Sequence, residues 1–122
     1  MSNRFAVFSI IATIAMGFAG QAFAHAHLKT SVPSDKSTVT ASPASLALSF
    51  SEGLNLKFTG IKLIGPQKAT VKTGDAALTD NGTGLAVPVT GTLPAGTYTV
   101  EWHALSTDGH KTTGTYSFTV KP

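Results

Sequence analysis

The chain is 122 residues long, carries nine Lys and Arg against six Asp and Glu for a formal net charge of +3, and contains no cysteine. Since no disulfide can hold such a chain together, its fold must depend on a hydrophobic core. The lysines are dispersed and form no basic stripe interleaved with aromatic residues, which argues against a nucleic-acid partner.

The first 24 residues have the pattern of a secretion signal. One Arg lies in residues 1–4, residues 5–20 are almost wholly apolar and uncharged, and Ala22-Phe23-Ala24 matches the small-x-small site of signal peptidase. The apolar run is too short and too early for a convincing membrane span, and no second run follows. We therefore expect cleavage after Ala24 and a mature domain, residues 25–122, that lies in the periplasm and is not inserted in the membrane. An uncleaved N-terminal anchor is the alternative.

Cleavage after Ala24 would make His25 the first residue of the mature protein. Its free amine and its imidazole would then come from one residue and could chelate a metal ion together. A cut after Ala26 also fits the small-x-small pattern and would make His27 the first residue instead. We favour the cut after Ala24.

The mature part has the alternating pattern of an all-β protein. A first strand near residues 27–30 is expected at the edge, and apolar residues alternate with polar ones in the later segments 46–50, 58–64, 85–89, 98–104 and 116–120. Turn residues such as Gly65-Pro66 and Asn81-Gly82 separate these runs. About seven short strands at this spacing predict an Ig-like Greek-key β-sandwich, with Trp102 and Tyr98 in its core.

The loop predicted at residues 105–113, between the last two strands, carries Asp108 and His110 with Gly109 between them. A carboxylate and an imidazole at this spacing can point the same way and share a metal ion. Asp-x-His alone is a weak signal, because a solvated polar loop has the same pattern. The signal becomes stronger if the first strand brings His25 to the same end of the sandwich.

His25, Asp108 and His110 together would supply three nitrogens and one oxygen. Tetragonal coordination by N and O suits Cu(II), which also has the highest affinity in the divalent series. Cu(I) favours Cys or Met, and both methionines of the chain lie in the first 24 residues. Zinc is the main competitor, although its tetrahedral preference fits the one-residue chelate less readily.

Two further histidines have simpler interpretations. His27 would be third from the new N-terminus, where it could join the amine and two backbone amides in a tail-only Cu(II) or Ni(II) site. We favour the alternative that it begins the first strand and points outward. His103 alternates with Trp102, so we expect it on the surface.

Several segments resemble the CopC-type periplasmic copper-binding proteins. These segments are residues 25–28, Pro33, residues 48–52, residues 93–102 and residues 106–110. The resemblance spans the mature chain in the same order and implies a β-sandwich that binds one Cu(II) per chain through His25, Asp108 and His110. It also implies copper homeostasis or resistance, with copper buffered or delivered to a CopD-type inner-membrane copper importer. In some relatives the acid equivalent to Glu52 joins the site, but here we expect Glu52 to be only a neighbour.

Other function classes remain as alternatives. A copper-dependent oxidative enzyme could use an N-terminal His brace, but this chain is short and has only one Trp and two Tyr for a polymer-binding face. An Ig-like module with incidental histidines is the other alternative. No nucleophile–base group and no phosphate loop is evident, so we expect a monomeric binding protein without enzymatic activity.

Overall fold

The structure, a computed structural model, describes residues 25–122. The predicted secretion signal, residues 1–24, lies outside the described residues. Within them the chain forms nine β-strands and three short 3-10 turns, and none of its helical turns is long and apolar enough to cross a membrane.

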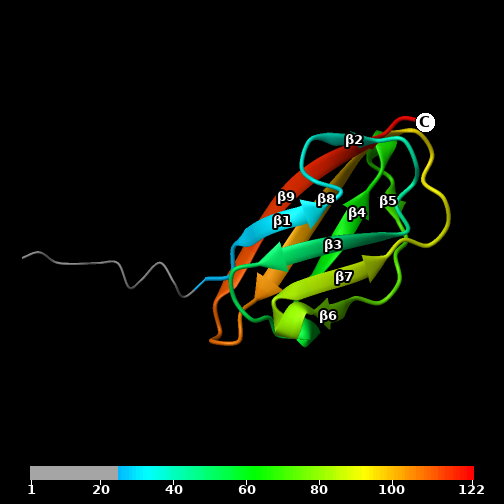
Figure 1. The fold of residues 1–122 in the computed structure, drawn as a ribbon. Helices are drawn as coiled ribbons and strands as arrows, with labels where there is room; N and C mark the ends of the chain where they lie inside the picture. The colour runs from blue at the N-terminus through cyan, green and yellow to red at the C-terminus, as the bar shows by residue number, and fades with distance from the viewer. Residues whose placement is uncertain (1–24) are drawn as a thin grey trace, which may run out of the picture.

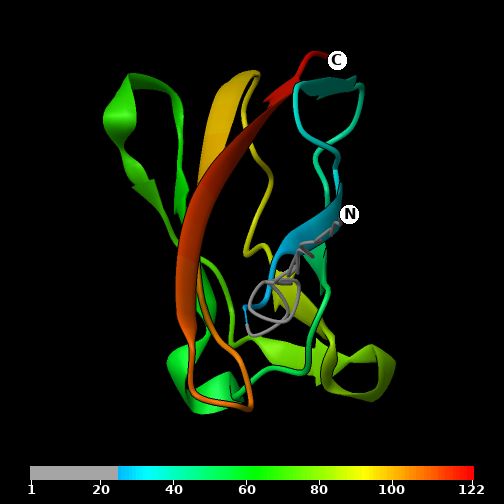
Figure 2. The ribbon, with the colours of Figure 1, turned by 90° about the vertical axis from the view of Figure 1, so that its left-hand side faces the viewer.

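The strands form two sheets that face each other (Figures 1 and 2). The first sheet has the order β1 (Leu28–Val32), β3 (Ser45–Phe50), β7 (Gly84–Pro88) and β6 (Ala77–Thr79). The second has the order β2 (Ser37–Val39), β9 (Lys111–Val120), β8 (Gly96–Leu105), β4 (Gly60–Ile64) and β5 (Thr70–Val71). All pairings are antiparallel except that of β2 with β9. The prediction of an all-β two-sheet sandwich is thus confirmed.

The core lies between the sheets and is made by the alternation seen in the sequence. Every second residue of β8 from Tyr98 to Ala104 is buried, as are Leu46, Leu48 and Phe50 of β3. The Phe50 and Trp102 rings meet edge to face at 5.2 Å between centroids and so join the two sheets. Burial of Tyr98 and Trp102 confirms their predicted place in the core.

Gly114 of β9 is required by the close approach of Trp102. The two residues pair across β8 and β9, and a Cβ atom on Gly114 would lie 2.5 Å from Cζ2 of the indole. Only a residue without a side chain leaves room for the ring at this position.

Three local expectations need correction. The strand expected over residues 58–64 begins at Gly60, because Phe58 belongs to a 3-10 turn, η2 (Leu56–Phe58), whose start is capped by the Asn55 side chain. The loop expected over residues 105–113 comprises only residues 106–110, since β9 begins at Lys111. The count of nine strands exceeds seven because β2 and β5, with three and two residues, are too short to produce an alternation signal. Two other 3-10 turns, η3 (Pro66–Lys68) and η4 (Asp80–Gly82), connect strands.

One end of the sandwich brings distant parts of the sequence together. There β1 begins, β3 ends, and β8 turns into β9 (Figure 1). As expected, the first strand lies at the edge of its sheet, where it pairs only with β3.

Candidate metal centre

The residues that follow His25 are firmly attached to the sandwich. Ala26 is fully buried, and its carbonyl accepts a hydrogen bond from the Thr112 hydroxyl at 2.8 Å. The backbone N–H of His27 donates to the Ser51 hydroxyl at 2.9 Å, and the N–H of Ser51 donates to the His27 carbonyl at 2.9 Å. These bonds hold the backbone next to His25 against Ser51, which directly follows β3, and against the start of β9.

The loop of residues 106–110 is a tight turn closed by its own backbone. The N–H of Ser106 donates to the His110 carbonyl at 2.9 Å, and the N–H of Gly109 donates to the Ser106 carbonyl at 2.9 Å. Gly109 has φ +94°, a left-handed conformation that glycine adopts without steric cost. A bond at 3.0 Å from Thr107 N–H to the Gly53 carbonyl attaches the loop to the segment that follows β3.

Asp108 and His110 face each other across this turn. Oδ1 of Asp108 lies 3.2 Å from Nδ1 of His110, and both side chains are about half exposed. The Ser106 hydroxyl also donates to Oδ1 of Asp108. This bond, followed by the contact with His110, lowers the pKa of Asp108 below its usual value, so the side chain is a carboxylate and a hard oxygen donor.

His25 completes the predicted set. Its ring centroid lies 4.9 Å from that of His110, although the two residues are far apart in the sequence. The structure therefore brings His25, Asp108 and His110 to one end of the sandwich. As they stand, no three His, Cys, Asp or Glu side chains in residues 25–122 are arranged to hold a metal ion. In the uncut chain the nitrogen of His25 belongs to the peptide bond with Ala24, so the amine donor does not yet exist.

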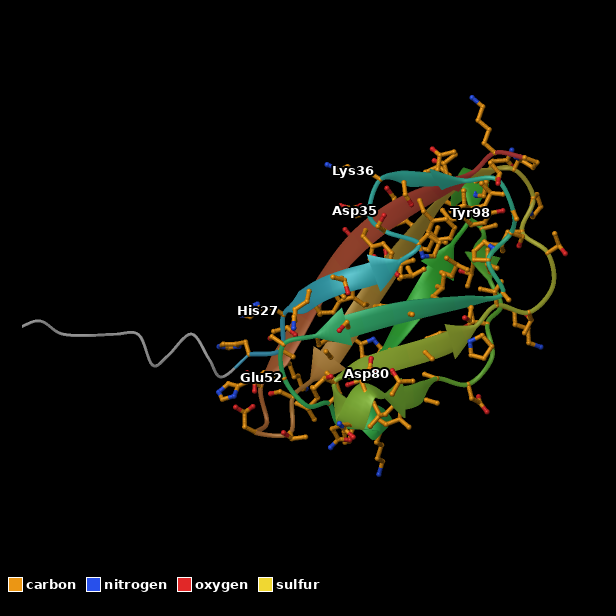
Figure 3. All side chains as sticks on the ribbon, viewed as in Figure 1. His27, Asp35, Lys36, Glu52, Asp80 and Tyr98 are labelled. Carbon is orange, nitrogen blue, oxygen red and sulfur yellow. The ribbon has the colours of Figure 1, made fainter. Side chains whose placement is uncertain are left out.

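His27 and Glu52 lie at the same end of the sandwich (Figure 3). His27 is exposed, as expected, with its ring centroid 6.4 Å from that of His25. A tail-only site would need the backbone nitrogens of Ala26 and His27 as ligands, but Ala26 is buried and His27 N–H is hydrogen-bonded. Glu52 is half-buried and, among the described residues, has no hydrogen bond or ion pair.

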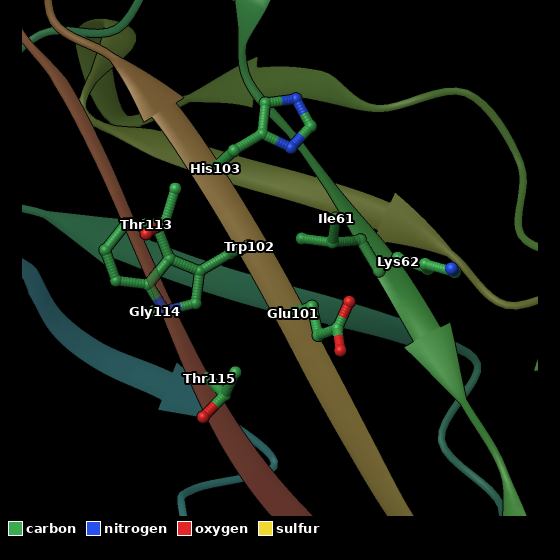
Figure 4. Close-up of a pocket in the computed structure, with 8 residues that line it drawn as sticks. All are labelled: Ile61, Lys62, Glu101, Trp102, His103, Thr113, Gly114 and Thr115. Atoms are coloured by element: carbon green, nitrogen blue, oxygen red, sulfur yellow. The ribbon is translucent and has the colours of Figure 1, made fainter. Parts of the chain in front are cut away.

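A hollow of about 510 Å³ lies on the outer face of the second sheet (Figure 4). Its lining includes Glu101, His103 and Lys62 but none of the predicted metal ligands. His103 is exposed there, which confirms its predicted place on the surface.

Three hydroxyl residues of this end were missed from the sequence. Ser106, Ser51 and Thr112 hold the loop and the N-terminal segment through the hydrogen bonds described above. Only Ser106 left a local signal, because Ser two residues before Asp often begins a hydrogen-bonded turn. Ser51 and Thr112 act on residues far away in the sequence and leave none.

Comparison with known proteins gives one consistent result. A family model described as the CopC domain matches residues 28–121. Protein YobA of Escherichia coli strain K12 is 45% identical over 100 residues, which are 81% of each chain. Copper resistance protein C of Escherichia coli is 42% identical over 118 residues, covering 88% of this chain and 90% of that protein. The crystal structure of PcoC, a methionine-rich copper resistance protein from Escherichia coli, matches with a TM-score of 0.73 and 41% identity, covering 80% of this chain and 100% of PcoC.

Proposed function

The chain belongs to the CopC family of copper resistance proteins, and on that premise we propose that its mature form binds one Cu(II) ion. The ligands are the amine and imidazole of His25, the carboxylate of Asp108 and the imidazole of His110. Copper-binding proteins of this family are not enzymes, so membership confirms the expectation that the chain has no catalytic activity and removes the oxidative enzyme as an alternative.

The approach of His25 to His110 is the observation that carries this proposal. The ring centroids of the two imidazoles lie 4.9 Å apart, and Oδ1 of the Asp108 carboxylate lies 3.2 Å from Nδ1 of His110. Buried Ala26 and the Thr112 bond keep His25 at this place, so little chain entropy would be lost on binding. The missing amine would be supplied by cleavage of the bond before His25.

The donor chemistry supports Cu(II) over Cu(I). Imidazole, amine and carboxylate are hard or borderline ligands, and neither Cys nor Met occurs in residues 25–122. PcoC is described as methionine rich, whereas residues 25–122 of this chain contain no methionine. A two-site carrier that exchanges Cu(I) and Cu(II) is therefore not part of this proposal.

Burial of Ala26 supports cleavage after Ala24. A cut after Ala26 would remove a residue that is fully buried and that accepts the Thr112 hydrogen bond. It would also leave His27, whose N–H is bonded to Ser51, as the first residue. We infer that the mature domain comprises residues 25–122 and that residues 1–24 direct it to the periplasm, where CopC proteins are generally found.

The proposed role is copper homeostasis. A monomeric domain with one exposed Cu(II) site can buffer copper or deliver it to a CopD-type inner-membrane importer. Exposure of Asp108 and His110 supports such an exchange, because a partner's ligands can reach the ion without unfolding the domain.

The N-terminal amine provides the decisive test. Intact mass of the exported protein gives the cut bond, and titration with Cu(II) gives the stoichiometry. The matched variant carries one extra glycine before His25, and its control carries the glycine after Pro122. We expect one Cu(II) per chain in the mature protein and its control, and at least about a tenfold loss of affinity in the N-terminal variant. Equal binding by all three would show that the His25 chelate is wrong, and no binding by any would favour an Ig-like module without a metal.

A further inference from the structure

We propose that Ser106 is a positioning residue that orients the Asp108 carboxylate and thereby sets the affinity and geometry of the copper site. This inference rests on the Cu(II) site proposed above and adds a residue that does not itself touch the ion.

Ser106 is held rigidly at the base of the loop. It is 2% exposed, it forms a bridge with Leu54, and its backbone closes the turn with His110 and Gly109. Ser106 is therefore a fixed, buried anchor for the hydrogen bonds that reach the exposed side chains of Asp108 and His110.

The Ser106 hydroxyl joins the two proposed ligands of the loop. Its proton goes to Oδ1 of Asp108, and its oxygen accepts the backbone N–H of His110 at 3.2 Å. The His110 carbonyl, 3.3 Å from the same hydroxyl, already receives the Ser106 N–H at 2.9 Å, so it does not need the hydroxyl proton. A hydroxyl has one proton, and a carboxylate is its stronger acceptor.

The bond from Ser106 makes the two Asp108 oxygens unequal. Oδ1 meets both the Ser106 hydroxyl and Nδ1 of His110, whereas Oδ2 makes neither of these contacts. The rotation of the carboxylate is thereby restrained, and Oδ2 is the oxygen presented to an incoming ion. Without the hydroxyl, the half-exposed Asp108 side chain can turn toward water.

The test is a double-mutant cycle on the mature protein with Cu(II) as the probe. Ser106→Ala and Asp108→Ala are made singly and together, and affinity is measured by competition with a chelator. Partners of metal ligands usually contribute about 10- to 100-fold in affinity, so Ser106→Ala should weaken binding by about tenfold. If Ser106 acts through Asp108, the same change should cost less than about twofold when Asp108 is already Ala.

Two controls separate positioning from a general effect on the fold. Thr107→Ala removes an exposed hydroxyl from the same loop that makes no hydrogen bond in the described structure, and it should leave affinity unchanged. Ser106→Thr keeps a hydroxyl and should restore part of the affinity. Electron paramagnetic resonance of bound Cu(II) should change in Ser106→Ala and not in Thr107→Ala, whereas a loss of stability alone would leave the spectrum of the folded fraction unchanged.

Unchanged affinity in Ser106→Ala, or equal losses with and without Asp108, would overturn the proposal for Ser106 while leaving the Cu(II) site intact. Absence of Cu(II) binding in the unmodified mature protein would instead refute the proposed function. If Ser106→Ala does not fold, NMR of the wild-type protein takes the place of the affinity measurements on this variant. A Ser106 hydroxyl proton protected from exchange, and exposed in Asp108→Ala, supports the inference, and an unprotected one refutes it.

Discussion

The hydroxyl of Thr112 donates a hydrogen bond at 2.8 Å to the carbonyl of Ala26, a residue 86 positions earlier in the chain. Thr112 lies at the start of β9, just after His110, and Ala26 lies between His25 and β1. One bond therefore couples the segments that carry the two histidines of the proposed copper site.

Removal of this bond should weaken copper binding without unfolding the domain. In Thr112→Val the Ala26 carbonyl loses its partner, and His25 is held less firmly beside His110. A hydrogen bond contributes a net of about 0.5–1.5 kcal/mol to stability. We therefore expect the Cu(II) affinity to fall roughly 3- to 10-fold and the free energy of unfolding to fall by about 0.5–1.5 kcal/mol. Chelator competition and urea denaturation measure the two effects.

Thr113→Val is the matched control, because Thr113 is exposed and makes no side-chain hydrogen bond in the described structure. It should bind Cu(II) as the wild type does. Equal affinity of Thr112→Val and Thr113→Val would mean that the tie to Ala26 is irrelevant to the site.

His110→Ala and His27→Ala should have opposite outcomes. Loss of His110 removes a proposed ligand from the loop, and we expect Cu(II) affinity to fall by at least about tenfold. Loss of His27 removes an exposed ring that follows buried Ala26, and affinity should stay within about twofold. Calorimetric titration of both mature variants gives the comparison. A tail-only site would reverse the order, because it needs His27 and not His110.

Tyr116 should make the domain sensitive to high pH. Its hydroxyl is buried and makes no well-formed hydrogen bond among the described residues. Burial raises its pKa to about 12, an effect that the nearby Ser31 hydroxyl partly offsets and the Asp35 charge slightly reinforces. The folded state therefore favours the protonated phenol more than the unfolded state does. This contribution is complete below about pH 10 and is lost as the pH rises through about 12.

Tyr116→Phe removes the titrating group and leaves the ring. At neutral pH its free energy of unfolding should equal that of the wild type or exceed it by up to about 1 kcal/mol, since an unsatisfied hydroxyl is lost. The wild type should lose stability relative to the variant between about pH 10 and pH 12. Urea denaturation across this range checks the difference, and parallel pH profiles for the two proteins would contradict it.

Gly114→Ala should destabilise the domain because the new Cβ atom would approach three atoms of the Trp102 ring within 3.0 Å. Overpacking of this kind costs about 1–3 kcal/mol. Trp102 is the sole tryptophan, so its fluorescence reports both unfolding of the domain and any displacement of the indole ring. Gly53→Ala is the control, since its Cβ atom would be at an ordinary 3.4 Å from Thr107. If Gly114→Ala unfolds at the same denaturant concentration as the wild type, the Trp102 ring has room to move.

Strand prediction from the sequence succeeded where alternation was long. In β3 and β8 each buried residue is followed by a more exposed one, and period-two patterns of five or more residues identify such strands. It failed at Phe58, which is apolar but half exposed in η2, because one side-chain cap from Asn55 ends the strand pattern there. It also missed β2, whose three residues pair in parallel with the end of β9 and depend on that distant strand.

The candidate ligands could be proposed from the sequence because their chemistry is local. His25 follows a small-x-small cleavage pattern, and Asp108-Gly109-His110 combines donors with a turn residue in three positions. The sequence by itself therefore determined the all-β class, the candidate donors and the absence of Cys and Met after residue 24.

Only the tertiary structure decided that the His25 and His110 rings lie next to each other. The sandwich puts the start of β1 beside the turn between β8 and β9, and this brings the His25 ring to 4.9 Å from that of His110. Burial of Ala26, the Thr112 bond and the Ser106 hydroxyl produce the arrangement, and each joins residues whose contact depends on packing. Long-range contacts of this kind form because two faces of apolar residues exclude water between the sheets, which no short motif encodes.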